Sequence, residues 1–157
     1  MRDRSTHEAS PAVAVRWLRP LAAGTLLVLA LQFLVGMVVN LYVQIPASHP
    51  GTNAPEYFSG VAQGVVWALS DGAWSLKLHA VVGLLLFIAA IVMLVFAIML
   101  RRRAWIIATV VGLLGIMSAG FNGASFMNYG HDFSSLIMST GFLIAVIAYA
   151  VGFYVTR

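Results

Sequence analysis

Two histidines beside long uncharged segments are the residues of this sequence whose type and position could do chemistry. His79 lies three residues inside an apolar run that begins at Leu76, and His131 stands at the start of the last apolar run. Ionisable side chains in such segments are rare and are functional candidates by default. Two imidazoles that project from different helices into a bundle can be the axial ligands of a haem iron. The pattern predicts a haem b site formed by His79 and His131.

Four further residues could complete this site. Gly83 follows His79 on the same helical face and would leave space for a flat macrocycle, while the amides of Gln32 and Asn122 could face its ring or propionates. Met138 lies at a similar depth to His79 and is an alternative ligand. Buried amides also hydrogen-bond between helices, so a structural role for both stays open.

Other roles for the histidines stay open as well. A histidine near a helix end is often an interfacial polar residue, and His131 with Asp132 could cap a helix. A zinc or copper site from His49, Glu56, His131 and Met127 is a further alternative, although their spacing matches no known ligand pattern. Residues 120–132, GFNGASFMNYGHD, are the densest cluster of amide, hydroxyl, glycine and imidazole groups.

The elements that must position these residues are four helices. Residues 21–55, 78–100, 104–131 and 133–156 contain no Asp, Glu, Lys or Arg. Each run is long enough for an α-helix to cross a hydrocarbon layer about 30 Å thick, and none alternates as a barrel strand does. We therefore expect an all-α membrane protein, an up-down four-helix transmembrane bundle. The expected helices span residues 21–44, 76–100, 104–124 and 132–156.

Two regions lie outside these helices. Residues 1–15 are polar and without periodicity, which predicts a disordered cytoplasmic arm before a transmembrane domain of residues 16–157. Residues 45–75 form a long outer loop that opens with several prolines and glycines. Within that loop, the apolar stripe of residues 57–70 predicts a short amphipathic helix on the outer surface.

Charge placement predicts the topology. Arginines gather before the first helix, between the second and third helices, and at the end of the chain, whereas Glu56, Asp71 and Asp132 lie on the opposite side. The positive-inside rule then places both termini in the cytoplasm of a multi-pass protein of the plasma or inner membrane. This placement accounts for the basic charge without nucleic acid as a partner. The absence of cysteine excludes disulfides and thiolate metal sites.

Small residues recur along one side of the third expected helix. They stand three or four positions apart, so a neighbouring helix can approach this side closely. The side could pack within the bundle, or dock onto a larger membrane complex or a second copy of the chain. These small residues are Ala108, Gly112, Gly115, Ala119 and Gly123.

Three matching features carry a resemblance to a known family. They are the segment LQFLVG at residues 31–36, His79 at the outer start of the second helix, and His131 at the outer start of the fourth. In these features the chain resembles one four-helix half of the haem A synthase family, whose bundles hold haem through a histidine on each of those helices. The chain lacks that family's cysteine pair and intramembrane acid, which argues against haem A synthesis and leaves the haem-holding scaffold. The segments NLYVQIPASHPG and GFNGASF are also similar to small bacterial membrane proteins of uncharacterised activity.

Two functions follow as expectations. The first is a b-type haem-binding membrane protein, with haem near the outer face, for electron transfer or haem handling. The alternative is an accessory or assembly subunit of a larger, respiratory-type membrane complex. No nucleophile triad, phosphate loop or paired carboxylate site occurs in the sequence, so we expect no independent catalytic activity.

Overall fold

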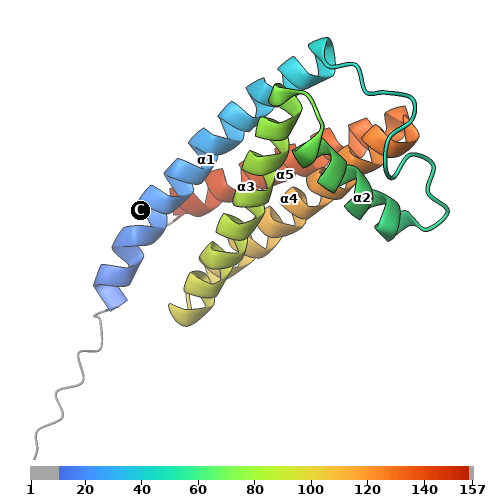
Figure 1. The fold of residues 1–157 in the computed structure, drawn as a ribbon. Helices are drawn as coiled ribbons and strands as arrows, with labels where there is room; N and C mark the ends of the chain where they lie inside the picture. Colours follow the sequence, from blue (N-terminus) through green and yellow to red (C-terminus); the bar gives the residue numbers. More distant parts are fainter. Residues whose placement is uncertain (1–10, 156–157) are drawn as a thin grey trace, which may run out of the picture.

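The computed structural model describes residues 11–155, which form five helices joined by loops (Figure 1). Four of the helices are long and apolar, and the described residues contain no strand, so the predicted all-α four-helix bundle is confirmed. The helices are α1 (Pro11–Tyr42), α2 (Tyr57–Ser70), α3 (Trp74–Met99), α4 (Arg103–Tyr129) and α5 (Asp132–Val155).

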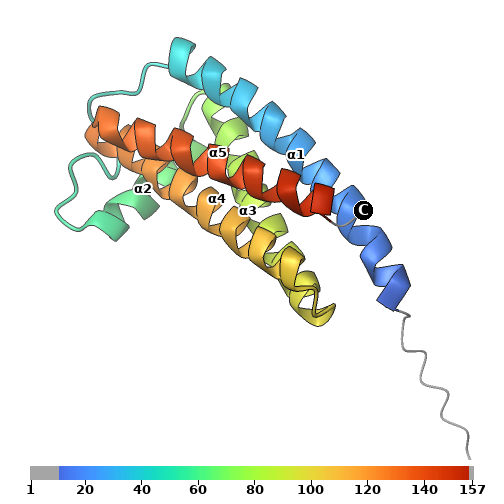
Figure 2. The same cartoon turned by 180° about the vertical axis from the view of Figure 1, so that it is seen from behind.

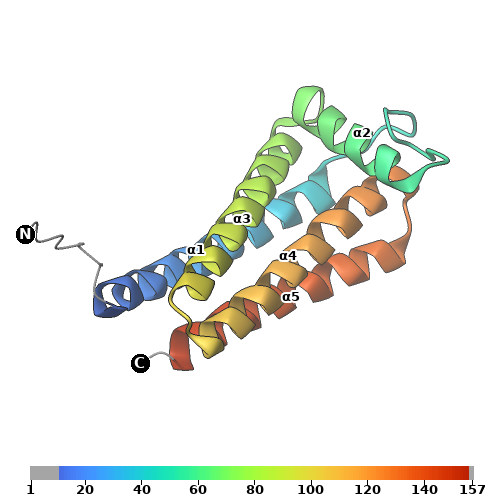
Figure 3. The ribbon, with the colours of Figure 1, turned by 90° about the horizontal axis from the view of Figure 1, so that it is seen from below.

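The four long helices pack as a ring of neighbours. α1 packs on α3 and α5, and α4 packs on the same two helices, so that α3 and α5 lie diagonally and their backbones do not approach one another within residues 11–155. α1 begins and α5 ends at the same end of the bundle as the turn between α3 and α4 (Figure 3). We call this end, which carries Arg101, Arg102 and Arg103, the arginine end. The opposite end, with α2 and the loop of residues 43–56, is the cap end (Figure 2).

Large apolar side chains cover the outside of the bundle. Leu27 is 63% exposed, Leu85 58% and Ile107 65%, and similar residues surround them on every long helix. A protein in water does not leave so much apolar surface uncovered, whereas lipid solvates it well. All four long helices also have the length and hydropathy that a membrane span needs. The chain is therefore a multi-pass membrane protein.

The closest helix contact joins α4 to α5. A Cβ atom added at Gly115 would lie 2.6 Å from the carbonyl oxygen of Gly141, and one at Gly112 would lie 2.7 Å from the ring of Tyr149. The small-residue side of α4 thus allows close approach, as its spacing predicts. Its neighbour at these positions is α5 of the same chain. The expectation that this helix also meets a larger complex or a second copy stays a prediction.

Helix bounds differ from expectation at several points. α1 begins at Pro11, so residues 11–15 are helical and not part of a disordered arm; residues 1–10 lie outside the described residues. α1 ends at Tyr42, two residues earlier than expected. α4 continues to Tyr129, five residues beyond its expected end, and stops at Gly130, whose φ of 65° is a left-handed C-cap.

α2 confirms the short helix predicted in the outer loop. Its N-terminus is capped by Glu56, whose carboxylate accepts hydrogen bonds from the backbone N–H groups of Phe58 and Ser59 at 3.1 and 2.6 Å. Carboxylate caps satisfy the free N–H groups of the first helical turn and complement the helix dipole. The helix lies across the ends of α3 and α4 (Figure 3).

Polar contacts fasten the cap to the end of α4. The amide of Asn128 donates to the carbonyl of Gly60 at 2.7 Å, and the Asn128 carbonyl accepts from the N–H of Asn53 at 3.3 Å. The Tyr129 hydroxyl donates to the carbonyl of Ala54 at 3.1 Å. Gly64 admits the Asn128 side chain, since a Cβ there would lie within 2.3 Å of Oδ1. The cap is therefore a packed layer built on the last turn of α4.

Changing Asn128 to alanine is expected to loosen the cap. The change removes the hydrogen bond to Gly60 and the side chain against Gly64, a loss of about 1–3 kcal/mol for a buried polar contact. Limited proteolysis of residues 43–56 in reconstituted protein should then be several-fold faster. Asn122→Ala is the matched control, because Asn122 donates only to Ser118 within its own helix. Equal cleavage rates in the two variants would contradict this role of Asn128.

Candidate functional site

His79 lies in the second turn of α3, inside a membrane-spanning segment and near the cap end. Its imidazole faces α1 at Gly36, where an added Cβ would lie 2.9 Å from Cε1 and 3.4 Å from Nδ1. Any larger residue at position 36 would displace the ring. Gly36, the glycine of the LQFLVG segment, therefore leaves the space that the His79 imidazole occupies between α1 and α3.

Gln32 lies one turn before Gly36 on α1 and joins the same cluster. Its Nε2 donates to the backbone carbonyl of His79 at 2.9 Å. The amide occupies the space beside Gly83, where an added Cβ would lie 3.3 Å from Nε2. The structure thus brings together His79, Gln32 and Gly83, three of the site residues predicted from sequence. Together with Gly36 we call them the His79 site.

Two polar atoms in the His79 site are buried and have no hydrogen-bond partner. They are Nδ1 of His79 and Oε1 of Gln32. A neutral imidazole nitrogen can donate or accept a hydrogen bond, and an amide oxygen accepts one. Leaving such atoms unpaired costs about 1–3 kcal/mol each in a protein interior. The imidazole and the amide of this site can therefore each form one more hydrogen bond or ligand bond, at a membrane depth where water is scarce.

His131 lies apart from this site. It stands between the C-cap Gly130 and the first residue of α5, is exposed, and stacks on Tyr129 with ring centroids 6.3 Å apart and planes 8° apart. Tyr129 stacks in turn on Tyr57 of α2 at 6.1 Å. This aromatic stack holds His131 at the cap surface, and the backbone of α5, which begins at the next residue, does not approach α3. The two histidines predicted as a pair therefore do not face one another.

Asn122 and Met138 also lie on the α4 and α5 side of the bundle. Asn122 donates to the carbonyl of Ser118 one turn earlier at 2.9 Å. Met138 packs against α4, where a Cβ added at Gly123 would lie 3.1 Å from its sulfur. Neither residue hydrogen-bonds to the His79 site. Their geometry is that of helix packing, which was the alternative left open for Asn122.

The alternative zinc or copper set is dispersed. Nδ1 and Nε2 of His49 lie 3.0 and 3.3 Å from the carbonyl oxygens of Pro50 and Met127, and the Glu56 carboxylate caps α2. His131 belongs to the aromatic stack described above. Across the described part of the chain, no three His, Cys, Asp or Glu side chains gather closely enough to hold a metal ion.

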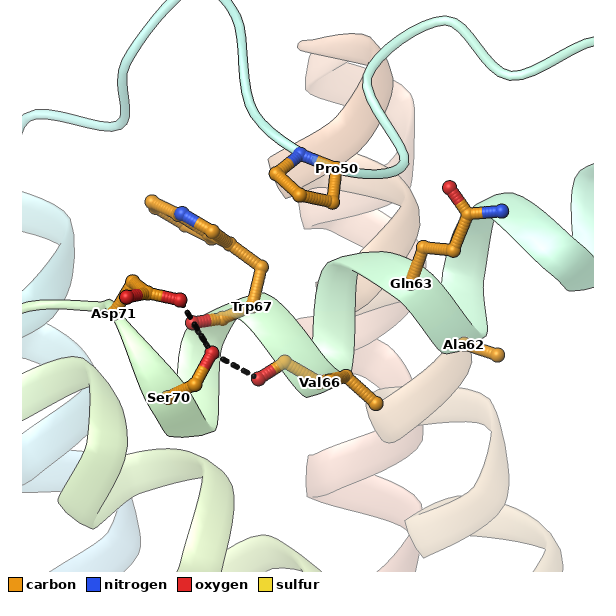
Figure 4. A pocket seen from close by; sticks show the side chains of 7 residues that line it. All are labelled: Pro50, Ala62, Gln63, Val66, Trp67, Ser70 and Asp71. Carbon is orange, nitrogen blue, oxygen red and sulfur yellow. Dashed lines mark hydrogen bonds between the residues drawn. The ribbon is translucent and has the colours of Figure 1, made fainter.

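A hollow of about 300 Å³ lies on the cap between Pro50 and α2 (Figure 4). Trp67 forms one wall, and the His49 ring stacks on it at 4.4 Å. Asp71 is the charged residue of the lining, and it accepts a hydrogen bond from the Ser70 hydroxyl at 2.5 Å. The lining is otherwise mostly apolar, so this hollow suits contact with another surface better than chemistry.

The residues that hold the cap in place were not singled out by the sequence patterns. Asn128 and Tyr129 fall inside the segment marked as a polar cluster, but their partners in the outer loop are 68 and 75 residues away in sequence. One local signal was available. Gly60 and Gly64 stand four residues apart on α2, a spacing that lets another element approach closely.

No family model, no curated protein and no solved structure matches this chain. Its function must therefore be inferred from the geometry of its own residues.

Proposed function

We propose that this chain is an inner-membrane protein that binds haem b through His79, for electron transfer or haem handling. The observation that carries the proposal is the pair of buried, unpartnered polar atoms on His79 and Gln32. An intramembrane imidazole with a free nitrogen is a haem-ligand candidate, and unpaired polar atoms in a membrane span favour a ligand that would engage them.

The residues of the His79 site offer a ligand specific groups. Gly36 and Gly83 give room to the His79 imidazole and the Gln32 amide, and Gln32 fastens α1 to the His79 backbone. His79 would hold the haem iron through its imidazole, and Gln32 would hold the His79 helix in register and offer its free oxygen to a polar group. Bound haem would supply one-electron redox chemistry. His131, exposed and held by Tyr129, is not needed in this arrangement.

Orientation follows from charge. The arginine end is proposed to face the cytoplasm, because basic residues are retained on that side of bacterial inner membranes. Both termini would then be cytoplasmic, and the cap, which carries the acidic residues Glu56 and Asp71, would face outward. The His79 site would lie near the outer face of the membrane.

A reduced-minus-oxidised visible spectrum tests the function. The protein is expressed with ample haem supply and purified in mild detergent, and a pyridine haemochrome assay gives the stoichiometry. One haem b for each chain is the expected result. A colourless protein that is folded and monodisperse would overturn the haem proposal.

The exposed aromatic residues on the cap favour a second candidate function, that of an accessory subunit. Phe58 is 67% exposed and Trp74 78% exposed, and the Trp67 hollow lies on the same layer. Such residues suit the centre of a protein interface. A colourless protein that copurifies in fixed ratio with one membrane complex, and loses it on Phe58→Ser, would support this candidate.

A further inference from the structure

A groove on the outside of the bundle is independent of the His79 site. It runs between α4 and α5 at the arginine end and encloses about 310 Å³. Its floor is made of small buried residues and its rims of exposed branched ones. The floor residues are Ala108, Ala148 and Gly152, and the rim residues include Ile107, Val111 and Val151.

The groove exists because α4 and α5 approach closely there. A Cβ added at Gly152 would lie 3.0 Å from that of Ala108 and 3.2 Å from the Trp105 ring, so small residues set the depth of the floor. Trp105 is fully buried behind the floor and closes the groove towards the bundle interior. The groove therefore opens only outward, to the lipid side, and is lined by apolar side chains.

The arginine end adds positive charge at one end of the groove. Arg102 and Arg103 are exposed and directly precede Ala104, the groove residue nearest this end of α4. Neither has an ion-pair partner among the described residues, whose acidic side chains, Glu56, Asp71 and Asp132, are all at the cap end. A narrow apolar groove with unpaired cations at one end complements an amphiphile that has a negative head.

We propose that an anionic glycerophospholipid binds here, with one acyl chain in the α4–α5 groove and its phosphate at Arg102 and Arg103. Basic sites between membrane helices are known to select anionic head groups. Because lipid tails are as apolar as the groove, selectivity comes from the head group, and the groove sets which tail is held. The proposal does not depend on haem.

A second copy of the chain fits the groove less well. Two copies in one membrane share the same orientation, so a symmetric contact through this groove would place both sets of Arg101, Arg102 and Arg103 at the same depth. Like charges brought together in this way repel one another. The groove is also short, because residues 104–111 of α4 rise only about 10 Å.

Lipid retention measured by native mass spectrometry tests the proposal. The full-length protein is released from nanodiscs of equal phosphatidylglycerol and phosphatidylcholine, and the two bound lipids are counted. Wild type should retain phosphatidylglycerol in preference, and the double variant Arg102→Gln, Arg103→Gln should lower that preference roughly 25-fold, about fivefold for each arginine. Arg101 is kept to preserve the orientation of the chain.

A groove-filling variant tests the same site without changing charge. Ala104→Leu should reduce retention of both lipids, whereas Ala23→Leu, the same change at an exposed alanine of α1, should leave it unchanged. Equal retention of both lipids by wild type, or no effect of Ala104→Leu, would overturn the proposal. A dimer mass lost on Ala104→Leu would overturn it in favour of a second copy. Haem content should be the same in all four proteins, so failure of the haem proposal would be seen separately.

Discussion

Replacing His79 by alanine is expected to abolish haem binding, while replacing His131 by alanine is expected to leave it intact. The two histidines separate because His79 is packed against Gly36 inside a membrane span, whereas His131 is exposed and stacked on Tyr129. Haem content for each chain, taken from the pyridine haemochrome assay, is the measurement. The expected change for His79→Ala is from one haem to none.

The control for His79 must separate ligation from packing. His79→Gln keeps most of the side-chain volume against Gly36 and removes the imidazole, so it should be colourless but as stable as wild type to thermal unfolding in detergent. Loss of haem in His131→Ala as well would restore the paired ligation expected from sequence. Full haem content in both His79 variants would reject His79 as the ligand.

Replacing Gly115 by alanine is expected to cause the largest loss of stability of any single methyl group added to α4. The new Cβ would lie 2.6 Å from the Gly141 carbonyl oxygen and 2.9 Å from the Ala145 nitrogen, and both are backbone atoms that cannot rotate away. The helices must move apart, and overpacking of this kind costs about 3 kcal/mol. The midpoint of unfolding in a detergent and denaturant titration measures the loss.

Gly120 provides a matched control on the same helix. An added Cβ there meets nothing within 4 Å, so Gly120→Ala should leave the free energy of unfolding within about 1 kcal/mol of wild type. Similar midpoints for the two variants would show that α4 and α5 are not held together by backbone contact at Gly115.

Sequence patterns predict the membrane spans well because a span depends on the length and hydropathy of its own segment, and both can be read from that segment alone. The uncharged runs correspond to α1, α3, α4 and α5, and the segment after the prolines of the outer loop folds as α2. Helix ends were less predictable. α4 continues to Tyr129 because Asn128 and Tyr129 find partners in α2 and in the loop before it, some 70 residues away in sequence, which local signals do not contain.

The candidate site was predictable in part for a related reason. His79, Gln32 and Gly83 come together because their positions on α1 and α3 face each other in the bundle. The direction of His131 depends on the left-handed Gly130 and on the stack with Tyr129, and neither can be read from helical periodicity. Helix rotation is set by packing with neighbours, so the pairing of two histidines on different helices needed the structure. Haem itself stays a prediction.

The hydrogen bond from Gln32 to His79 has a consequence for biosynthesis. Its two partners are 47 residues apart, and a ribosome adding about 5–20 residues each second makes the second partner roughly 2–10 s after the first. During that interval the Gln32 amide has no His79 carbonyl to receive it. The apolar residues of α1 must therefore favour membrane insertion without this hydrogen bond, which can form only once α3 has been made.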